Sequence, residues 1–189
     1  FRRERFWDMT GTSVLVTKKS DILTSFNKIR WEDDKWAITD RPNVFPRAYL
    51  VTNVKKITDP DEELVAMFSR DTDLKNIAFT EEPIFGLNNG AEVNGSVKIN
   101  SYKEQEIQMV VNTPSTAFLV LSDTFYPGWK VLIDGENSKI YRTNFTFRGV
   151  VVPKGNHKVV WYYEPTIFKL GILLSGSSVL IWLIFVIIY

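Results

Sequence analysis

The sequence contains no cysteine and a single histidine, His157, among its 189 residues. The lack of cysteine excludes disulfides, thiolate metal sites and a cysteine nucleophile, and one histidine cannot build a multi-histidine metal centre. A GxSxG elbow, a P-loop and a GxGxxG turn are also missing. We therefore expect no cofactor, no metal and no catalytic set within this chain, and we expect His157 to be an exposed turn residue.

An excess of either charge is missing as well. Lys and Arg number 23 and Asp and Glu 22, which leaves a formal net charge of +1. Proteins that bind nucleic acid usually carry a clear basic excess, so nucleic acid is not expected as a partner. With 44% hydrophobic and 14% aromatic residues, the chain has enough apolar surface to bury a core, which argues against disorder.

Charge is absent altogether from the end of the chain. All Lys, Arg, Asp and Glu residues lie at or before Lys169, and residues 170–189 contain none. A helix of this length spans about 30 Å, the thickness of the hydrocarbon core of a bilayer. Because residues 179–189 also lack the polar stripe of a soluble helix, we predict a transmembrane helix over residues 169–189 with the lipid bilayer as partner. A buried core helix is the alternative.

Small residues lie in the first half of this predicted helix, at Gly171, Ser175 and Gly176. Small side chains allow two helix backbones to approach closely in a membrane. We interpret them as a face that packs on other transmembrane helices of a larger parent protein. A solitary anchor, which needs no such face, is the alternative.

Before the helix, the hydrophobic pattern predicts a mainly β domain. Residues 1–90 mix short apolar runs with charged loops and are expected to form an N-terminal α+β part. We expect strands there at residues 13–17, 35–39 and 47–52. One short helix is expected to start with Asp59 as N-cap and Pro60 as first helical residue, and to end near Arg70.

Residues 91–165 show only strand-like segments, separated by turn sequences such as Pro127-Gly128 and Asp134-Gly135. We expect strands at residues 93–102, 106–112, 116–122, 129–134, 139–143, 146–152 and 158–163. Short strands at this spacing are typical of an antiparallel β-sandwich. The predicted fold class is therefore mainly β: an antiparallel β-sandwich with one short helix, followed by a single C-terminal transmembrane helix.

The stretch LSDTFYPGW at Leu121–Trp129 gathers three aromatic residues around a Pro-Gly turn. Aromatic faces beside a carboxylate are a common way to hold a sugar, by stacking and by hydrogen bonds to hydroxyl groups. Asp123, Tyr126 and Trp129 are therefore candidate ligand-binding residues. In the alternative, the rings plug one end of the sandwich and Asp123 caps the turn.

Two arginines, Arg142 and Arg148, flank the corner at residues 144–147. Guanidinium groups suit phosphate or lipid headgroups, which makes both arginines further candidates for ligand binding. The alternative is that they pair with nearby acids or carbonyl groups.

An ordered series of motifs resembles a known family. The run LSDTFYPGWKVLIDG, then YRTNFTFRGVVVPKGNHKVVWYYEP, then Phe168 and Gly171, resembles the C-terminal region of the YfhO family of bacterial membrane proteins. The earlier segments SVLVTKK and FPRAYLV resemble parts of the same region.

This resemblance implies a large polytopic protein similar to GT-C glycosyltransferases, which use polyprenyl-phosphate-linked sugars on the outer face of the membrane. Some YfhO-type proteins are linked to glycosylation of lipoteichoic acid. The resemblance implies a cell-membrane location with the soluble domain on the extracytoplasmic side, and a glycan or lipid-linked sugar as partner. The catalytic acid of GT-C enzymes lies in an early loop outside this sequence, so no residue here is expected to be catalytic. Acceptor binding, a non-catalytic carbohydrate-binding module and a purely structural sandwich all stay open.

Overall fold

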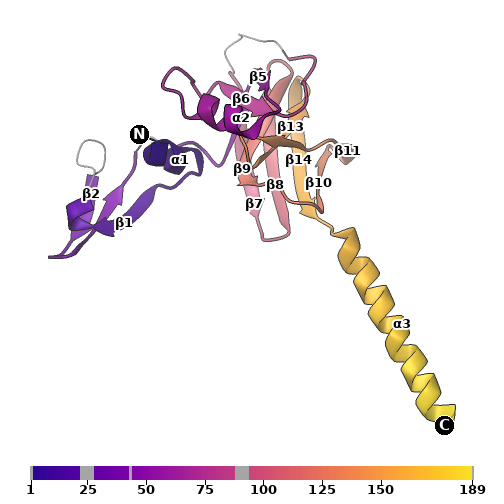
Figure 1. Ribbon diagram of the computed structural model, residues 1–189. Coiled ribbons are helices and arrows are strands. Elements are labelled where there is room, and N and C mark those ends of the chain that lie inside the picture. Colours follow the sequence, from indigo (N-terminus) through magenta and orange to yellow (C-terminus); the bar gives the residue numbers. More distant parts are fainter. Residues whose placement is uncertain (1, 22–27, 43, 88–93, 189) are drawn as a thin grey trace.

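The computed structural model describes residues 2–21, 28–42, 44–87 and 94–188. It shows a β-rich body from which one long helix departs, with a small separate sheet on the opposite side of the body (Figure 1). The predicted fold class, a mainly β chain with antiparallel sheets and one apolar C-terminal helix, is confirmed.

Two sheets make up the body. The larger has six strands in the order β4 (Ala48–Val51), β9 (Ala117–Thr124), β13 (Phe147–Val152), β12 (Tyr141–Thr143), β6 (Ile77–Thr80) and β5 (Asn53–Lys56). The smaller has five, in the order β11 (Glu136–Ser138), β10 (Trp129–Ile133), β14 (Gly155–Tyr163), β8 (Glu106–Thr113) and β7 (Ser96–Tyr102). All neighbours are antiparallel except β5 and β6. The larger sheet combines strands that precede residue 90 with strands that follow it. The division of the chain into residues 1–90, 91–165 and 169–189 stays a prediction.

The two sheets pack face to face because alternate residues of each are apolar. Ile107, Met109 and Val111, which the alternation places on one face of β8, are at most 1% exposed. Val159 and Trp161 of β14 are also fully buried, and together with residues of β4, β9 and β13 they form one core cluster. The expected sandwich therefore rests on the period-two pattern that the sequence shows.

Two short helices lie against the other face of the larger sheet. In α2 (Pro60–Met67), Asp59 caps the first turn by accepting hydrogen bonds from the backbone N–H groups of Asp61 and Glu62, each at 2.9 Å. The predicted helix start is thus confirmed, and the helix ends at Met67 because Phe68 leaves the helical dihedral region. α1 (Arg2–Met9) was not expected because its charged sequence has no helical periodicity, and its Met9 packs in the same second core as Met67.

The small separate sheet has the order β1 (Val14–Lys18), β3 (Trp36–Asp40) and β2 (Lys28–Glu32), with a 3-10 turn at Lys19–Asp21. β1 and β3 correspond to the strands expected at residues 13–17 and 35–39, and each begins and ends one residue later than expected. β2, like β5, β6 and β11, carries too short or too polar a sequence to show the strand pattern. In β2, for example, all five residues are exposed.

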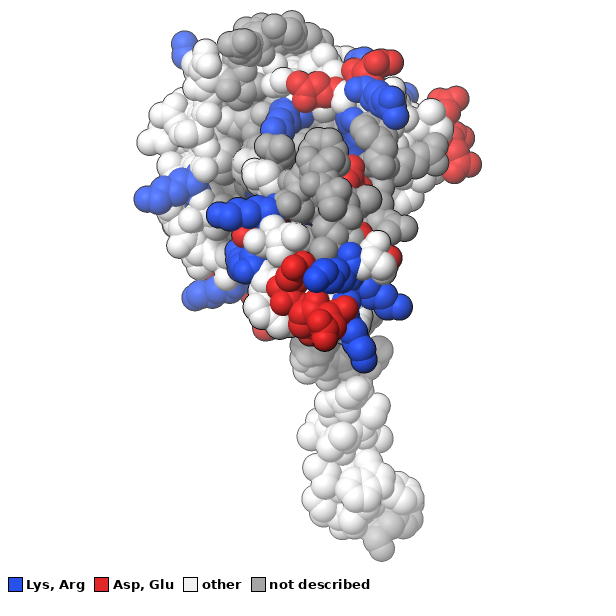
Figure 2. All heavy atoms as spheres, turned by 90° about the vertical axis from the view of Figure 1, so that its left-hand side faces the viewer, with Lys and Arg blue, Asp and Glu red and all other residues white. Residues whose placement is uncertain are grey.

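The long helix α3 spans Thr166–Ile188. An 18-residue stretch within it has a mean hydropathy of 2.5 and none of the helix residues is buried, so it does not form the core helix that was the alternative. It is long and apolar enough to cross a membrane. Figure 2 shows the charged side chains on the body and none on the lower part of α3. Only Glu164 and Pro165 separate β14 from α3, fewer residues than the sequence suggested, so the sandwich lies next to the start of the helix.

Candidate functional site

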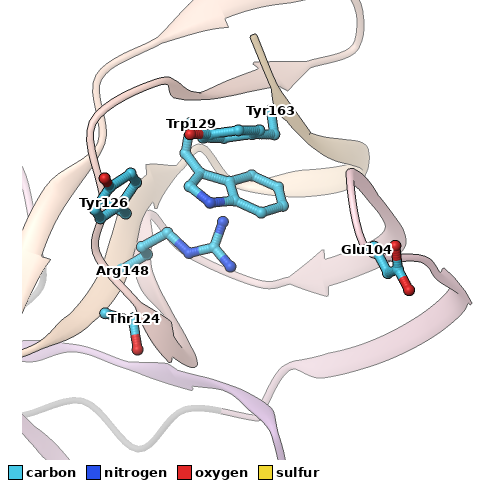
Figure 3. A pocket seen from close by; sticks show the side chains of 6 residues that line it. All are labelled: Glu104, Thr124, Tyr126, Trp129, Arg148 and Tyr163. Atoms are coloured by element: carbon cyan, nitrogen blue, oxygen red, sulfur yellow. The ribbon is translucent and has the colours of Figure 1, made fainter. Parts of the chain in front are cut away.

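A cavity of about 360 Å³ lies at the end of the sandwich from which α3 departs. Figure 3 shows the side chains that line it. They are Glu104, Thr124, Tyr126, Trp129, Arg148 and Tyr163. Its position is set by β14, because Tyr163 is the last residue of that strand and only two residues separate it from α3. Any ligand in this cavity would therefore be held beside the membrane helix.

The Pro127-Gly128 turn between β9 and β10 shapes one wall. Gly128 has φ +102°, and a Cβ there would lie 2.9 Å from the Tyr163 ring and 3.1 Å from the Pro165 backbone, so only glycine fits. The Gly128 carbonyl also accepts a hydrogen bond from the Glu164 N–H at 2.7 Å. The turn is therefore packed directly on the link between sandwich and helix.

This turn brings three aromatic rings together. The Tyr163 ring centre lies 5.5 Å from that of Trp129 and 6.5 Å from that of Tyr126. Tyr126 is 59% exposed, whereas Trp129 and Tyr163 are half-buried. Trp129 also packs against the core cluster of the sandwich, as the plugging alternative expects, whereas Tyr126 leaves one side of the cavity open.

Arg148 of β13 reaches into the same end of the sandwich. Its guanidinium carbon lies 3.9 Å from the centre of the Trp129 ring and 5.5 Å from that of Trp161, which is the geometry of a cation–π contact. The side chain is only 2% exposed. Burial lowers the pKa of Arg148, and the charge of Asp123 opposes this effect. An arginine stays protonated at neutral pH even so, because its ordinary pKa lies far above 7.

Asp123 of β9 is the acid that faces this arginine. Its carboxylate accepts hydrogen bonds at 2.9 Å from Arg148 Nη2, from Arg47 Nη1 and from the Tyr102 hydroxyl. The burial of Tyr102, and then its bond to Asp123, raises the pKa of this phenol. Asp123 therefore links three strands, β9, β13 and β7, and the chain segment before β4. It does so in place of the turn-capping role considered from the sequence.

The predicted candidates separate into two groups. Tyr126, Trp129 and Arg148 line the cavity, and Asp123 lies behind Arg148. Arg142 is elsewhere: its Nη2 lies 2.6 Å from the Glu81 carboxylate and its guanidinium lies over the Phe145 ring. Pairing with local acids, the alternative for both arginines, is thus what the structure shows. Ligand binding by any of these residues stays a prediction.

Some lining residues were missed by the sequence reasoning. Tyr163 had a usable signal, because its place two residues after the buried Trp161 puts it on the inner face at the strand end. Glu104 belongs to the turn between β7 and β8, and it meets the β9–β10 turn only through the pairing of distant strands. No local pattern marks such a residue. Within the described ranges, no group of three His, Cys, Asp or Glu residues could hold a metal ion.

The small residues of α3, Gly171, Ser175 and Gly176, face open space in the structure. A Cβ added at Gly171 or Gly176 would meet nothing within 4 Å, and Ser175 is exposed. The hydroxyl groups of Ser177 and Ser178 are satisfied by the Leu174 carbonyl at 2.8 and 2.9 Å. Packing of this face on other helices stays a prediction.

His157 lies within β14 and is only 16% exposed, which corrects the expectation of an exposed turn residue. Its Nδ1 lies 2.6 Å from the Asp134 carboxylate. This hydrogen bond raises the pKa of His157 and lowers that of Asp134. The pair therefore stabilises the fold between the two pKa values in the folded state. The stabilisation is lost as the pH rises through the pKa of His157 or falls through that of Asp134.

We expect the imidazole of His157 to titrate above the pKa of an ordinary histidine. It is the only histidine in the chain, so an NMR titration of the imidazole signals reports on it alone. Asp134→Asn is expected to bring the pKa of His157 back toward the ordinary value, because the hydrogen bond to the carboxylate is what raises it. An unchanged His157 titration in Asp134→Asn would contradict the pairing.

Comparison with known proteins identifies the family of the chain. The family described as bacterial membrane protein YfhO matches residues 65–175, more than half of the chain, a span that includes the whole cavity lining. The curated "Uncharacterized protein YfhO" of Bacillus subtilis (strain 168) is 25% identical over 111 residues, which are 58% of this chain and 13% of that protein. No solved structure matches. With a family match over this much of its length and a helix able to cross a membrane, the chain belongs to the YfhO family of bacterial membrane proteins.

Proposed function

We propose that this chain is an extracytoplasmic domain, with its membrane helix, of a polytopic membrane protein that resembles lipid-linked-sugar glycosyltransferases of the GT-C type and acts in cell-envelope glycosylation. In this proposal the sandwich contributes to binding the glycan acceptor, and the catalytic residues belong to parts of the protein outside this sequence. The observation that carries the proposal is the aromatic cavity next to α3.

The lining of the cavity suits a sugar. The ring of Tyr126 is exposed and available for stacking. Thr124 and Glu104, both exposed, offer a hydroxyl and a carboxylate that can bond to sugar hydroxyl groups. The volume of about 360 Å³ falls within the roughly 300–1,000 Å³ of typical ligand pockets.

The link to the membrane helix supports a ligand that is itself near the membrane. Glu164 accepts a hydrogen bond from Lys130 Nζ of β10 at 2.6 Å and another from Lys169 of α3. These two bonds lower the pKa of Glu164 to about 2, so it stays ionised at any physiological pH. A two-residue connection braced in this way keeps the cavity close to the headgroup layer.

The second candidate is a membrane-attached sandwich that binds carbohydrate without catalysis, or that is purely structural. It is favoured by the state of Asp123, the acid that lies behind Arg148. Both carboxylate oxygens of Asp123 already accept hydrogen bonds from neighbouring side chains. These bonds join β7, β9, β13 and the segment before β4, which gives Asp123 a structural role and leaves it poorly placed to bind a sugar.

We expect Tyr126→Ala and Trp129→Ala in the full-length protein to weaken the use of acceptor in a sugar-transfer assay. The expected change is a rise in acceptor KM of about fivefold for each ring, because stacking contributes about 1 kcal/mol. Trp36→Ala is the matched control, since Trp36 is also partly exposed but lies in the small separate sheet.

Unchanged KM and acceptor range in both cavity variants would remove acceptor binding from the proposal. The two candidate functions are separated by the transfer assay itself. A full-length protein that binds glycan through Tyr126 and transfers no sugar would favour the non-catalytic module.

A further inference from the structure

Arg148 keeps hydrogen-bonding capacity that the protein does not use. Its Nη2 donates to Asp123, whereas Nε and Nη1 are buried and have no hydrogen-bond partner among the described residues. The side chain is 98% buried, since its exposed share is 2%. Buried cationic groups are normally fully paired, because a charge removed from water without partners is costly. Arg41 has the same two atoms unpaired, but only Arg148 of the two lines the cavity.

The charge balance behind the cavity is also incomplete. Arg47 and Arg148 share the single carboxylate of Asp123. Arg47 is 45% exposed on its side chain, so water can solvate it, but water does not reach Arg148 in the same way. One carboxylate therefore faces two guanidinium groups behind the cavity, and the acid of the lining, Glu104, is exposed and forms no described ion pair with Arg148.

The unsatisfied group lies at the cavity. Arg148 is one of the six lining residues, and Figure 3 shows the end of its guanidinium extending into the space between Trp129 and Glu104. The side facing Trp129 is occupied by the indole, which leaves the edge of the guanidinium for a ligand. Glu104 lies on the opposite, exposed side and takes no part in the described ion pairs of Arg148.

Resting on the proposed function, we infer that the ligand of this cavity carries a phosphate ester. Its oxygens accept hydrogen bonds from Arg148 Nη1, its hydroxyl groups bond to Glu104 and Thr124, and its carbon skeleton packs on Tyr126. An arginine edge matches phosphate oxygens in charge and in geometry. Because the cavity lies beside α3, such an ester reaches it either as a lipid headgroup or as a soluble sugar phosphate.

Entry of the phosphate requires a small displacement of the rim. Nη1 has almost no exposed surface, so a phosphate reaches it only if a lining residue moves, and Tyr126, which is 59% exposed, has room to do so. Binding should therefore change the environment of both Tyr126 and the stacked Trp129. This gives a fluorescence signal as well as an NMR signal from the Arg148 Nε–H group.

The test uses the full 189-residue chain in a polyoxyethylene detergent, which contains neither sugar nor phosphate. One arm titrates glucose 6-phosphate against glucose, and the other adds phosphatidylglycerol to the micelles. We expect saturable binding of a phosphate ester with a shift of the Arg148 Nε signal. Arg148→Met is expected to weaken this binding about 10- to 100-fold, as for loss of charge-assisted hydrogen bonds.

Two further variants keep the test decisive if Arg148→Met fails to fold. Glu104→Gln removes an exposed negative charge from the cavity and is expected to tighten binding of the phosphate ester about two- to fivefold. Arg142→Met is the matched control on the neighbouring strand, because Arg142 faces Glu81 and not the cavity. It is expected to leave binding unchanged.

The outcomes separate this inference from the proposed function. Glucose bound as tightly as glucose 6-phosphate, with no effect of Glu104→Gln, would overturn the inference and leave the glycan site. Binding of phosphatidylglycerol alone would support the phosphate site and overturn the proposed glycan. No saturable binding in either arm would overturn both.

Discussion

Asp123→Ala is expected to lower the free energy of unfolding by about 3–5 kcal/mol, the usual cost of removing one partner from a buried ion pair. The carboxylate is 12% exposed and is the only described ion-pair partner of Arg148. Its removal leaves a buried guanidinium without an anion and deprives Arg47 and Tyr102 of their acceptor. Urea unfolding of the 189-residue chain in a neutral detergent, followed by tryptophan fluorescence, measures this change.

Removal of the arginine as well is expected to restore part of the lost stability. Arg148→Met in the Asp123→Ala background is expected to recover about 2 kcal/mol, because an apolar side chain of similar length fills the space beneath Trp129 and no unpaired charge remains. Glu81→Ala is the matched control, since the Arg142–Glu81 pair is 31% and 47% exposed and exposed pairs contribute less than about 1 kcal/mol. Equal losses in Asp123→Ala and Glu81→Ala would refute the proposed importance of burial.

Gly149→Ala is expected to lower the free energy of unfolding by about 3 kcal/mol, near the upper end of the usual cost of overpacking a core. Gly149 lies in β13, and a Cβ at this position would lie 2.3 Å from the ring of Phe118 and 2.6 Å from the Thr143 hydroxyl. Phe118 is fully buried and cannot rotate away. Local preference predicts the opposite sign, because glycine weakens a strand by roughly 0.5–1 kcal/mol relative to alanine.

A second substitution distinguishes these two effects. Phe118→Leu removes the ring atoms that the new methyl group would meet. Gly149→Ala is therefore expected to cost clearly less in the Phe118→Leu background than in the unchanged chain, as denaturant unfolding of the four variants would show. Strictly additive losses would mean that the ring is not the obstacle.

Local patterns were sufficient for many elements of the fold. The alternation Ile107, Met109, Val111 predicted the buried face of β8, and Asp59-Pro60 predicted the start of α2. These features depend on residues close in the chain, so the side-chain period and the cap chemistry are visible in the sequence. β2 and α1 were not predicted because neither has a periodic pattern of apolar residues. β2 is held by its pairing with β3, and α1 is held by the packing of Met9 in the second core cluster.

The candidate site was predictable only in part. Tyr126 and Trp129 stand next to the Pro127-Gly128 turn, so their proximity follows from the local sequence. Arg148 lies under Trp129, whereas Arg142 does not. This difference depends on the pairing of β13 with β9 and on the bulge between Phe147 and Arg148. The sequence presents both arginines as equivalent neighbours of one corner.

The sequence by itself determined the membrane helix and the alternating strands of the sandwich, because the length of an apolar run and the period of a strand are properties of consecutive residues. Only the tertiary structure decided which charges are buried and where the cavity opens. Arg47, Tyr102, Asp123 and Arg148 are far apart in the chain and meet through strand pairing. The physical reason is that burial and electrostatic pairing depend on distance in space, which local sequence does not encode.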